Sequence, residues 1–363
     1  MKKLCIQTWF SSLNFGTCLQ AYALFRVLTS NSYSVFFADG IGPTHNLTYR
    51  LKLFVAKMLH RQPRWATKRM KTIGRWSNQY LTVRWAHSSR QIEQLINDTD
   101  CFISGSDQIW NTHFTFAPEM FLSFAKNKKR ISYASSIGTN NVNPRHATTI
   151  KSLLTAYSHI SVREETGASE LRQLTGRSDI HKVADPTVLL SREDWTNIIA
   201  AATRPPKLPA HYALVYLLGD NPNYSKIATE IVQAHDIENV VLVPSLERPN
   251  LKLKAASVVS NIDPIQFASI IASADLVCTD SFHATMLSII FQRPFIELMR
   301  FSDSDDISQN SRIYDLLNHL DLKAQIYHAN SIPDISINFA KSERILQLDR
   351  ERSLNFLLNA IER

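Results

Sequence analysis

The chain of 363 residues is too long for a single compact core and suits two domains of ordinary size. Apolar residues make up 44% of it and charged residues 20%, and no apolar run approaches the roughly 18 residues of a membrane span, which excludes a disordered or membrane-spanning protein. The net charge is +8, and the four scattered cysteines form no C-x-x-C pair, so we expect reduced thiols in a cytoplasmic protein without a metal site.

The chain opens with a predicted strand, helix and strand. The apolar residues 2–10 predict the first strand, and the interruption by Gln7 and Thr8 argues against a secretory signal. A polar loop with Gly16 precedes a helix over residues 17–30, and a second strand follows at 33–39. This order is typical of a βαβ unit.

A basic insertion of mostly helical character follows at about residues 46–92. It contains no acidic residue but eleven Lys and Arg, more than the whole net charge. Mixed with Trp65, Trp76 and Trp85, these cations predict an anionic partner, for which an anionic membrane surface or a lipid phosphate is suited. The alternative is a helical insertion whose apolar side packs on its own domain. We expect no nucleic acid partner, because no RNA-binding motif accompanies the charge.

The rest of the chain continues the alternation of strands and helices. Pro186 is predicted to end regular structure at the close of the first half, and Asp263 with Pro264 predicts a helix start in the second half. Further strands are predicted at 100–105, 130–138, 159–165, 212–219, 239–245, 275–279 and 294–298, and further helices at 192–203, 221–236, 263–274 and 281–292.

These elements predict two Rossmann-like domains with the site in the cleft between them. We place the N-terminal domain at residues 1–187, with the insertion at about 46–92, and the C-terminal domain at 188–345. We expect the C-terminal helix at 346–363 to pack back on the N-terminal domain.

Ligands bind open α/β sheets beyond the carboxyl ends of the strands, so the polar residues there are the candidate site residues. These candidates are Asn14, Gly16, Ser104, Gly105, Ser106, Asp107, Ser135, Ser136, Arg163, Glu164, Asp185, Asp280, Ser281 and His283.

His283 is the candidate with the clearest chemistry. Asp280 or Ser281 is placed to cap the predicted helix, and His283 then lies in its first turn, where free backbone N–H groups attract anions such as phosphate. A histidine there can bind a phosphate or deliver a proton near neutral pH. The alternative is a histidine that hydrogen-bonds a loop carbonyl.

Two arginines and an aspartate complete the candidate set. Arg163 follows a strand and can bind a carboxylate or phosphate through two N–H groups, or else it pairs with a neighbouring Glu. Arg312 begins another predicted helix towards the same cleft. Asp107 can accept a hydroxyl proton or bind a sugar, although Gly-Ser-Asp is also common in turns. Asn14 and Gly16 form a loop that a ligand can approach closely.

Known phosphate-binding motifs are absent: there is no G-x-G-x-x-G and no G-x-x-x-x-G-K-[ST], so a dinucleotide or P-loop site is disfavoured.

The chain resembles the polysaccharide pyruvyl transferase family in segments that run in the family's order over most of its length. These segments are NFGTCLQAYAL, FISGSDQIWN, SYASSIG, SVREETG, VADPTVLL, TDSFHATMLSIIFQRPFI and NSRIYDLL.

The resemblance implies a fold like that of the GT-B glycosyltransferases. It also implies transfer of pyruvate from phosphoenolpyruvate, as co-substrate and without another cofactor, to a sugar as a cyclic ketal. Family acceptors are surface saccharides, commonly lipid-linked at the cytoplasmic face of the membrane, which would explain the basic insertion and a peripheral position there.

The resemblance also assigns roles to residues. His283 matches the family histidine that would protonate the donor as general acid, and Arg163 matches the arginine that binds phosphoenolpyruvate. Asp107 is our hypothesis for the base or acceptor-orienting group. Acceptor contacts are expected from Asn14, Gly16, Ser106 and Asp280.

One position departs from the family pattern. Where better-characterised members read Arg-Leu-His, this chain reads Ser281-Phe282-His283, so Arg300 or Arg312 would have to replace the missing cation. Two alternatives stay open: a GT-B glycosyltransferase that uses a nucleotide sugar, and a non-catalytic saccharide-binding protein.

Overall fold

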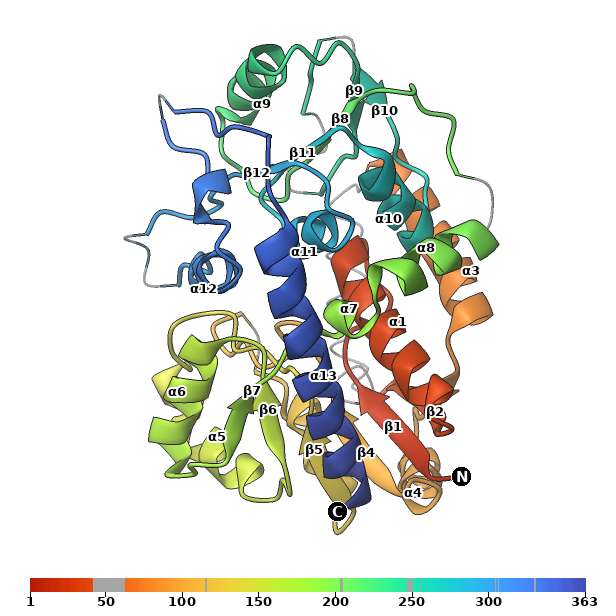
Figure 1. Ribbon diagram of the computed structural model, residues 1–363. Coiled ribbons are helices and arrows are strands. Elements are labelled where there is room, and N and C mark those ends of the chain that lie inside the picture. The colour runs from red at the N-terminus through yellow and green to blue at the C-terminus, as the bar shows by residue number, and fades with distance from the viewer. Residues whose placement is uncertain are drawn as a thin grey trace.

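The computed structural model shows an N-terminal and a C-terminal α/β domain, with the C-terminal helix running across both (Figure 1). The structure describes residues 1–41, 63–114, 116–202, 205–246, 251–254, 256–303, 305, 307–329 and 331–363.

The N-terminal domain is built on a parallel sheet in the order β3-β2-β1-β4-β5. The pair β6-β7 continues this sheet, because isolated bridges join Ile131 to His159 and Ser135 to Val162 beside β5. The strands are β1 Lys3–Gln7, β2 Ser34–Asp39, β3 Val83–Trp85, β4 Cys101–Ser104, β5 Lys129–Ser132, β6 Ile160–Val162 and β7 Ile180–Lys182. The helices are α1 Phe15–Ser30, α3 Arg64–Tyr80, α4 Ser89–Asn97, α5 Ala147–Leu154 and α6 Glu165–Thr175.

Helix α1 is buried on almost every side, because it lies between its own sheet, the short helix α7 (Pro186–Leu189) and the C-terminal domain. Its N-terminus is fixed by Asn14, whose side-chain oxygen accepts a hydrogen bond from the N–H of Gly16 at 3.0 Å. The first turn of α1 therefore points at the other domain, and that orientation positions the candidate site.

In its described residues, 63–92, the basic insertion is mostly helical, as predicted, but contains one short strand, β3. Residues 46–62 lie outside the described part of the chain. Helix α3 ends where Leu81 turns to extended backbone, and β3 then joins the sheet parallel to β2. This strand was not predicted; it forms because the free edge of β2 pairs with its backbone, as where the Phe37 N–H donates to the carbonyl of Thr82 at 2.9 Å.

The apolar side of α3 packs on the protein itself. Ile73 and Trp76 are buried in the main core, and Trp76 lies 5.9 Å from Tyr22 of α1 between ring centroids. For this helix the structure supports the alternative that the apolar face of the insertion packs on its own chain.

The C-terminal domain holds a second parallel sheet in the order β10-β9-β8-β11-β12. As predicted, Asp263 caps α10 with its side chain, and Pro264 takes the first position of that helix. Helix α9 begins at Tyr224, three residues after the predicted start of this helix at residue 221. The strands are β8 Ala213–Tyr216, β9 Val240–Leu242, β10 Ala256–Val258, β11 Leu276–Thr279 and β12 Phe295–Glu297. The helices are α8 Arg192–Ala201, α9 Tyr224–Ala234, α10 Pro264–Ser273, α11 Phe282–Ile290 and α12 Ser311–His319.

A short helix, α7 Pro186–Leu189, connects the domains. The prediction that Pro186 ends regular structure is wrong: proline suits the first position of a helix, and Asp185 caps α7 by accepting from the N–H of Thr187 at 2.9 Å.

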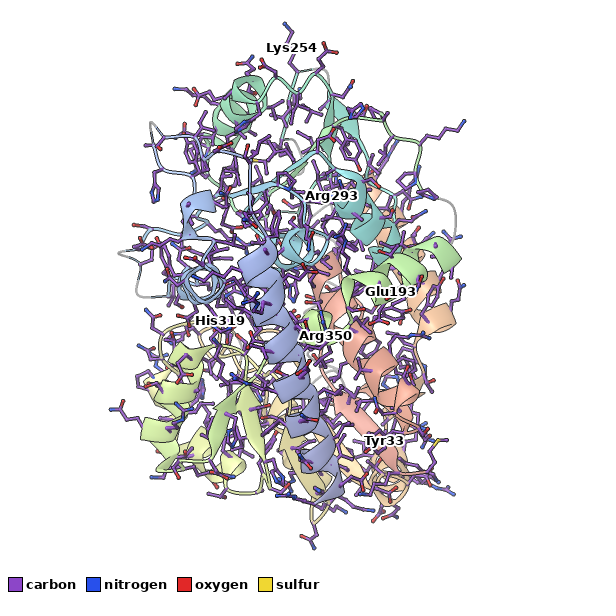
Figure 2. All side chains as sticks on the ribbon, viewed as in Figure 1. Tyr33, Glu193, Lys254, Arg293, His319 and Arg350 are labelled. Atoms are coloured by element: carbon purple, nitrogen blue, oxygen red, sulfur yellow. The ribbon has the colours of Figure 1, made fainter. Side chains whose placement is uncertain are left out.

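Helix α13, Ala340–Glu362, runs back from the C-terminal domain over α7 to the N-terminal sheet (Figure 1). Arg350 of this helix lies against α7 and donates to the carbonyl of Val188 at 2.7 Å (Figure 2). At its far end, Lys2 and Lys129 both donate to the carbonyl of Ile361. Within the described residues, no helix combines the length and the apolar character that a membrane crossing requires.

Candidate active site at the domain seam

His283 stands in the first turn of α11 where that helix meets the first turn of α1. A Cβ atom on Gly16 would lie 2.3 Å from Nδ1 of His283, so only glycine allows this approach. The imidazole side chain is 6% exposed. Because both helices present their N-termini here, the positive ends of two helix dipoles meet at the histidine.

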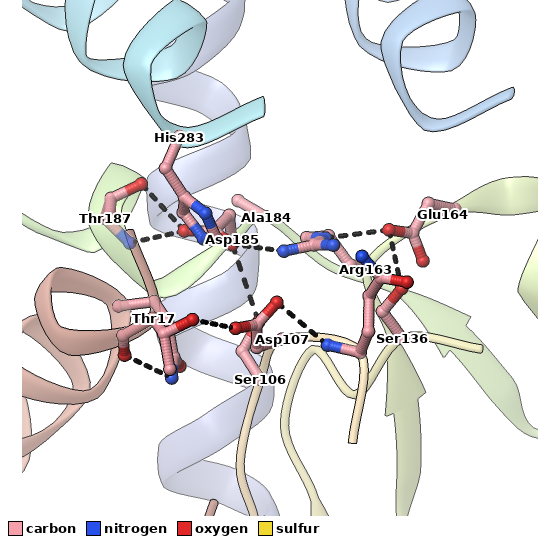
Figure 3. Close-up of polar contacts among 12 residues, drawn as sticks. Thr17, Ser106, Asp107, Ser136, Arg163, Glu164, Ala184, Asp185, Thr187 and His283 are labelled. Carbon is pink, nitrogen blue, oxygen red and sulfur yellow. Dashed lines mark hydrogen bonds and ion pairs between the residues drawn. The ribbon is translucent and has the colours of Figure 1, made fainter. Parts of the chain in front are cut away.

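Asp185 connects His283 to the N-terminal domain (Figure 3). Its Oδ2 lies 3.4 Å from Nε2 of His283 and 3.0 Å from Nη1 of Arg163. Its Oδ1 accepts from the N–H and the hydroxyl of Thr187. Burial on its own favours the neutral acid, but His283, Arg163 and the Thr187 N–H outweigh it and hold the pKa of Asp185 well below its usual range.

Arg163 is held by two carboxylates and an aromatic ring. Its Nε lies 2.7 Å from Oε1 of Glu164, and its guanidinium carbon lies 4.2 Å from the centre of the Phe282 ring. Burial disfavours its charge, but Glu164, Asp185 and Asp107 reverse this and raise the pKa of Arg163 above its usual value. The buried Nη2 has no hydrogen-bond partner among the described residues, and neither has Nε2 of His283.

Asp107 lies on the N-terminal side of the same cluster (Figure 3). Its φ of 71° is in the left-handed region, which suits the turn that follows β4. Oδ2 accepts from the hydroxyl of Thr17 at 2.6 Å, and Oδ1 accepts from the N–H of Gln108 at 2.9 Å. Ser106 donates to Asp185 at 3.5 Å. The turn interpretation and the site interpretation of Asp107 are therefore compatible.

Arg163 and Arg312 line a cavity of about 230 Å³ between α7, α11, α12 and α13, which we call the Arg163 cavity. Asp185 and Phe282 also line it. Arg312 is buried and donates to Gln309, and no carboxylate of the described chain lies within ion-pair distance of it. Burial, followed by repulsion from Arg163, lowers the pKa of Arg312 to about 9. A buried cation without a counter-ion is a favourable place for an anionic ligand.

A second cavity, of about 270 Å³, shares no lining residue with the first and is lined by Asn14, the residue that caps α1. We call it the Arg69 cavity. Its described lining residues are Ser12, Leu13, Asn14, Arg69, Tyr216, Leu218, Ser245, Leu246 and Arg300.

Arg69 was not among the sequence candidates. The signal that could have identified it is its place on the apolar stripe of α3, where Ala66, Arg69, Ile73 and Trp76 recur at helical spacing and are all buried.

The structure does not bring all the residues predicted to bind the donor substrate into one cavity. Arg312 joins Arg163, but Arg300 lines the Arg69 cavity instead. Ser281 takes the N-cap position of α11 without a side-chain capping bond.

Asp280 does not cap α11. Its carboxylate accepts from the N–H groups of Leu218 and Gly219 and from the hydroxyl of Tyr224, each at 2.7 Å or less. These bonds lie within the C-terminal domain and tie the loop after β8 to the end of β11. Among the described residues, no group of three or more His, Cys, Asp or Glu is arranged to hold a metal ion.

A family model described as polysaccharide pyruvyl transferase matches residues 14–299. The chain belongs to the polysaccharide pyruvyl transferase family. The match covers His283, Arg163, Asp185 and both helix N-termini, so the seam described above falls within the family's matched region. None of the curated proteins matches the sequence.

Solved structures show the fold that this pyruvyl transferase family member shares. S. aureus MnaA, solved with UDP, is 10% identical over 99% of this chain and 91% of that chain, with a TM-score of 0.52. UDP-GlcNAc 2-epimerase from Neisseria meningitidis, bound to UDP-GlcNAc, is 8% identical over 99% and 94%, with a TM-score of 0.51. The glycotransferase of kitacinnamycin is 13% identical over 99% and 97%, with a TM-score of 0.48. The shared fold is the GT-B arrangement of two Rossmann-like domains, as the sequence predicted.

Proposed function

We propose that this protein transfers pyruvate from phosphoenolpyruvate to a sugar of a surface polysaccharide or its precursor and closes a cyclic ketal. The observation that carries the proposal is the convergence of His283 and Arg163 on one carboxylate, Asp185, at the seam between the domains. Membership of the family supports the transferase class, and the residues of the seam support the donor.

The proposed donor site is the Arg163 cavity. Phosphoenolpyruvate is a trianion near neutral pH and needs cations with oriented donors. Arg312 supplies a buried charge that no described carboxylate neutralises, and Arg163 supplies an N–H group without a partner. Better-characterised family members have an arginine at the position of Ser281. We therefore propose that Arg312, and not Arg300, supplies the missing positive charge. No metal or organic cofactor enters the proposal.

His283 is the proposed general acid. A proton from its imidazolium passes to the methylene carbon of phosphoenolpyruvate, and the former double-bond carbon becomes an oxocarbenium-like centre. A sugar hydroxyl forms a C–O bond there and loses its proton, and the C–O bond to phosphate then breaks. A second hydroxyl closes the ketal and loses its proton. One of the two hydroxyl protons restores the imidazolium, and the other leaves with hydrogen phosphate. General acid catalysis of this kind contributes about 10²- to 10⁴-fold.

The acceptor is proposed to approach from the N-terminal domain. Asp107 would orient or deprotonate a hydroxyl, with Asn14, Gly16 and Ser106 beside it. Because His283 lines neither cavity and touches Gly16, the proposal includes a parting of the two domains at this contact when substrates enter.

The exposed face of α3 is proposed to lie on an anionic membrane surface, where a lipid-linked acceptor would be presented. The exposed residues Arg64, Lys68, Lys71 and Arg75 follow one another at steps of four, three and four, so they form one stripe. No described carboxylate pairs with them. Such a stripe is worth about 1 kcal/mol per cation near an anionic surface.

The donor and the chemistry are tested together. Pure protein is incubated with phosphoenolpyruvate and the saccharide of the producing cell, and phosphate release and the mass of a pyruvate ketal are followed. His283→Ala should lose about 10²- to 10⁴-fold in turnover with an unchanged circular dichroism spectrum. His211→Ala, at an exposed histidine of the same domain, is the matched control and should keep full activity.

The two alternatives predict other outcomes. Thermal stabilisation by a nucleotide sugar and not by phosphoenolpyruvate would favour a glycosyltransferase. A His283→Ala protein with unchanged saccharide affinity and unchanged biological output would favour a non-catalytic binding protein.

Membrane contact is tested by sedimentation with anionic vesicles at low ionic strength. The wild type should sediment and lose binding as salt rises, whereas replacing the four stripe cations by Gln should abolish sedimentation. A wild type that stays in the supernatant contradicts the membrane part of the proposal and leaves the chemistry untouched.

A further inference from the structure

Arg69 joins the insertion helix to the C-terminal domain in an unusual way. Its Nε donates to the carbonyl of Ser260 and its Nη1 to the carbonyl of Pro244, both at 2.8 Å. Its guanidinium carbon lies 4.8 Å from the Phe15 ring centre and 4.4 Å from that of Trp65. The residue is 1% exposed. The contacts orient the guanidinium firmly but supply no negative charge.

The charge of Arg69 is unbalanced in the described structure. Its partners there are carbonyl oxygens and rings, its buried Nη2 has no partner, and no described carboxylate lies within ion-pair distance. A buried arginine normally has a paired anion, because an isolated charge away from water is costly. Burial accordingly lowers the pKa of Arg69 to about 10.

The cavity beside Arg69 holds further groups that suit an anion. Arg300 lines it from the loop after β12; its Nε lies 3.5 Å from Oδ2 of Asp280 as an ion pair and makes no hydrogen bond among the described residues. Asn14 lines it at the N-terminus of the 16-residue helix α1. The cavity volume of about 270 Å³ accommodates a diphosphate with part of its substituent.

We propose that the Arg69 cavity binds a phosphate or diphosphate group carried by the saccharide substrate, with Arg69 and Arg300 as its cations. That the carrier is the acceptor rests on the proposed function, because this cavity shares no lining residue with the proposed donor site. The anion site itself stands on the geometry of Arg69 alone. Two sources share this chemistry, a sugar nucleotide and a prenyl-linked sugar diphosphate.

The experiment measures binding of inorganic pyrophosphate by calorimetry to the full chain, in the presence of saturating phosphoenolpyruvate. The wild type should bind, and Arg69→Gln and Arg300→Gln should each weaken binding by about tenfold or more. Arg312→Met and His283→Ala should leave pyrophosphate affinity unchanged, so a failure of the proposed chemistry is distinguishable from a failure of this site.

Arg69→Gln leaves two carbonyl groups without a donor and can compromise folding, so a second pair of variants is needed. Leu246 lines the mouth of the cavity with 38% of its surface exposed. Leu246→Glu should weaken pyrophosphate binding about tenfold relative to the isosteric, neutral Leu246→Gln, because a like charge faces the ligand.

Three results would overturn the proposal: no pyrophosphate binding to the wild type, equal affinities of the two Leu246 variants, or unchanged affinity in a folded Arg69→Gln protein. Competition then identifies the source. Displacement of pyrophosphate by UDP-GlcNAc indicates a sugar nucleotide, and displacement by geranyl diphosphate indicates a prenyl carrier. If neither displaces it, the assignment to a saccharide-borne diphosphate is wrong.

Discussion

Two buried aspartates, Asp185 and Asp280, each form a network of hydrogen bonds and ion pairs, but only the network of Asp185 connects the two domains. Each follows a strand at its carboxyl end and faces an arginine. The partners of Asp280 are two backbone N–H groups, Tyr224 and Arg300, which all belong to the C-terminal domain. Asp185 instead takes Arg163 from the N-terminal domain and His283 from the C-terminal domain.

The comparison indicates that the role of a buried carboxylate depends on whether its partners come from one domain or from both. A network inside one domain stabilises a loop and can stay formed throughout a reaction cycle. A network across a seam changes whenever the domains move or an anion enters, and it leaves Nη2 of Arg163 without a hydrogen-bond partner among the described residues. The following predictions test whether this contrast holds.

The largest expected effect separates the two aspartates. Asp185→Asn removes the charge that His283 and Arg163 share, and turnover should fall about 10²-fold or more. Asp280→Asn should instead lower the free energy of unfolding by about 1–3 kcal/mol, because two N–H groups and a hydroxyl lose a charged acceptor. Urea unfolding and turnover per folded molecule measure both variants. A stable, inactive Asp280→Asn protein would contradict the contrast.

The second comparison concerns the two arginines that could replace the family cation. Arg312→Met should raise the KM for phosphoenolpyruvate about 10- to 100-fold, because a charge-assisted contact to the donor is lost. It should not destabilise the protein, since it removes a buried cation that has no described counter-ion. Arg300→Met is the matched control and should leave this KM within about threefold. Equal effects of the two variants would mean that the two cavities are not separate in function.

The third comparison concerns a pH dependence of stability that arises beside Asp280. Burial, with a further contribution from Asp280, raises the pKa of Glu297 from 4.5 to about 8. Between these values the folded protein keeps a proton that the unfolded chain has lost, so stability should fall as pH rises, by up to about 1.4 kcal/mol per pH unit. Asp185 affects stability in the opposite direction. Because its pKa is lowered in the folded protein, its contribution to stability is lost only as pH falls below the usual aspartate range.

Glu297→Gln isolates this contribution. The variant should be more stable than the wild type at pH 8 and should gain less at pH 5, as measured by urea unfolding at both values. A wild type and variant with the same slope between pH 5 and pH 8 would show that Glu297 is ionised in the folded protein.

Much of the architecture could be predicted because it is encoded locally. The apolar runs and the Asp263–Pro264 pair identify strands and a helix start from neighbouring residues alone, and the structure has them. The loop predicted around Gly16 is wrong by two residues, because Asn14 caps α1 and Gly16 lies in its first turn. The first-turn position of His283 follows from the same local pattern. The edge strand β3 escaped prediction because three residues carry little periodicity, and the free edge of β2 decides their conformation.

Local patterns in the sequence were enough to predict two α/β domains, the order of most strands and helices, and the helix start that carries His283, because burial and capping act over a few residues. The strand ends were less well predicted, since β5 ends at Ser132 and β8 at Tyr216, before the predicted residues 138 and 219. Only the tertiary structure decided that Asp185 joins the histidine to Arg163, that Arg312 and Arg300 serve different cavities, and that Asp280 stays within its domain. Arg69 is the clearest case, since its two carbonyl partners lie 175 and 191 residues along the chain. The physical reason is that the groups packed around a buried charged side chain determine its orientation. At a domain seam, those surrounding groups come from segments far apart in the sequence, which no local pattern connects.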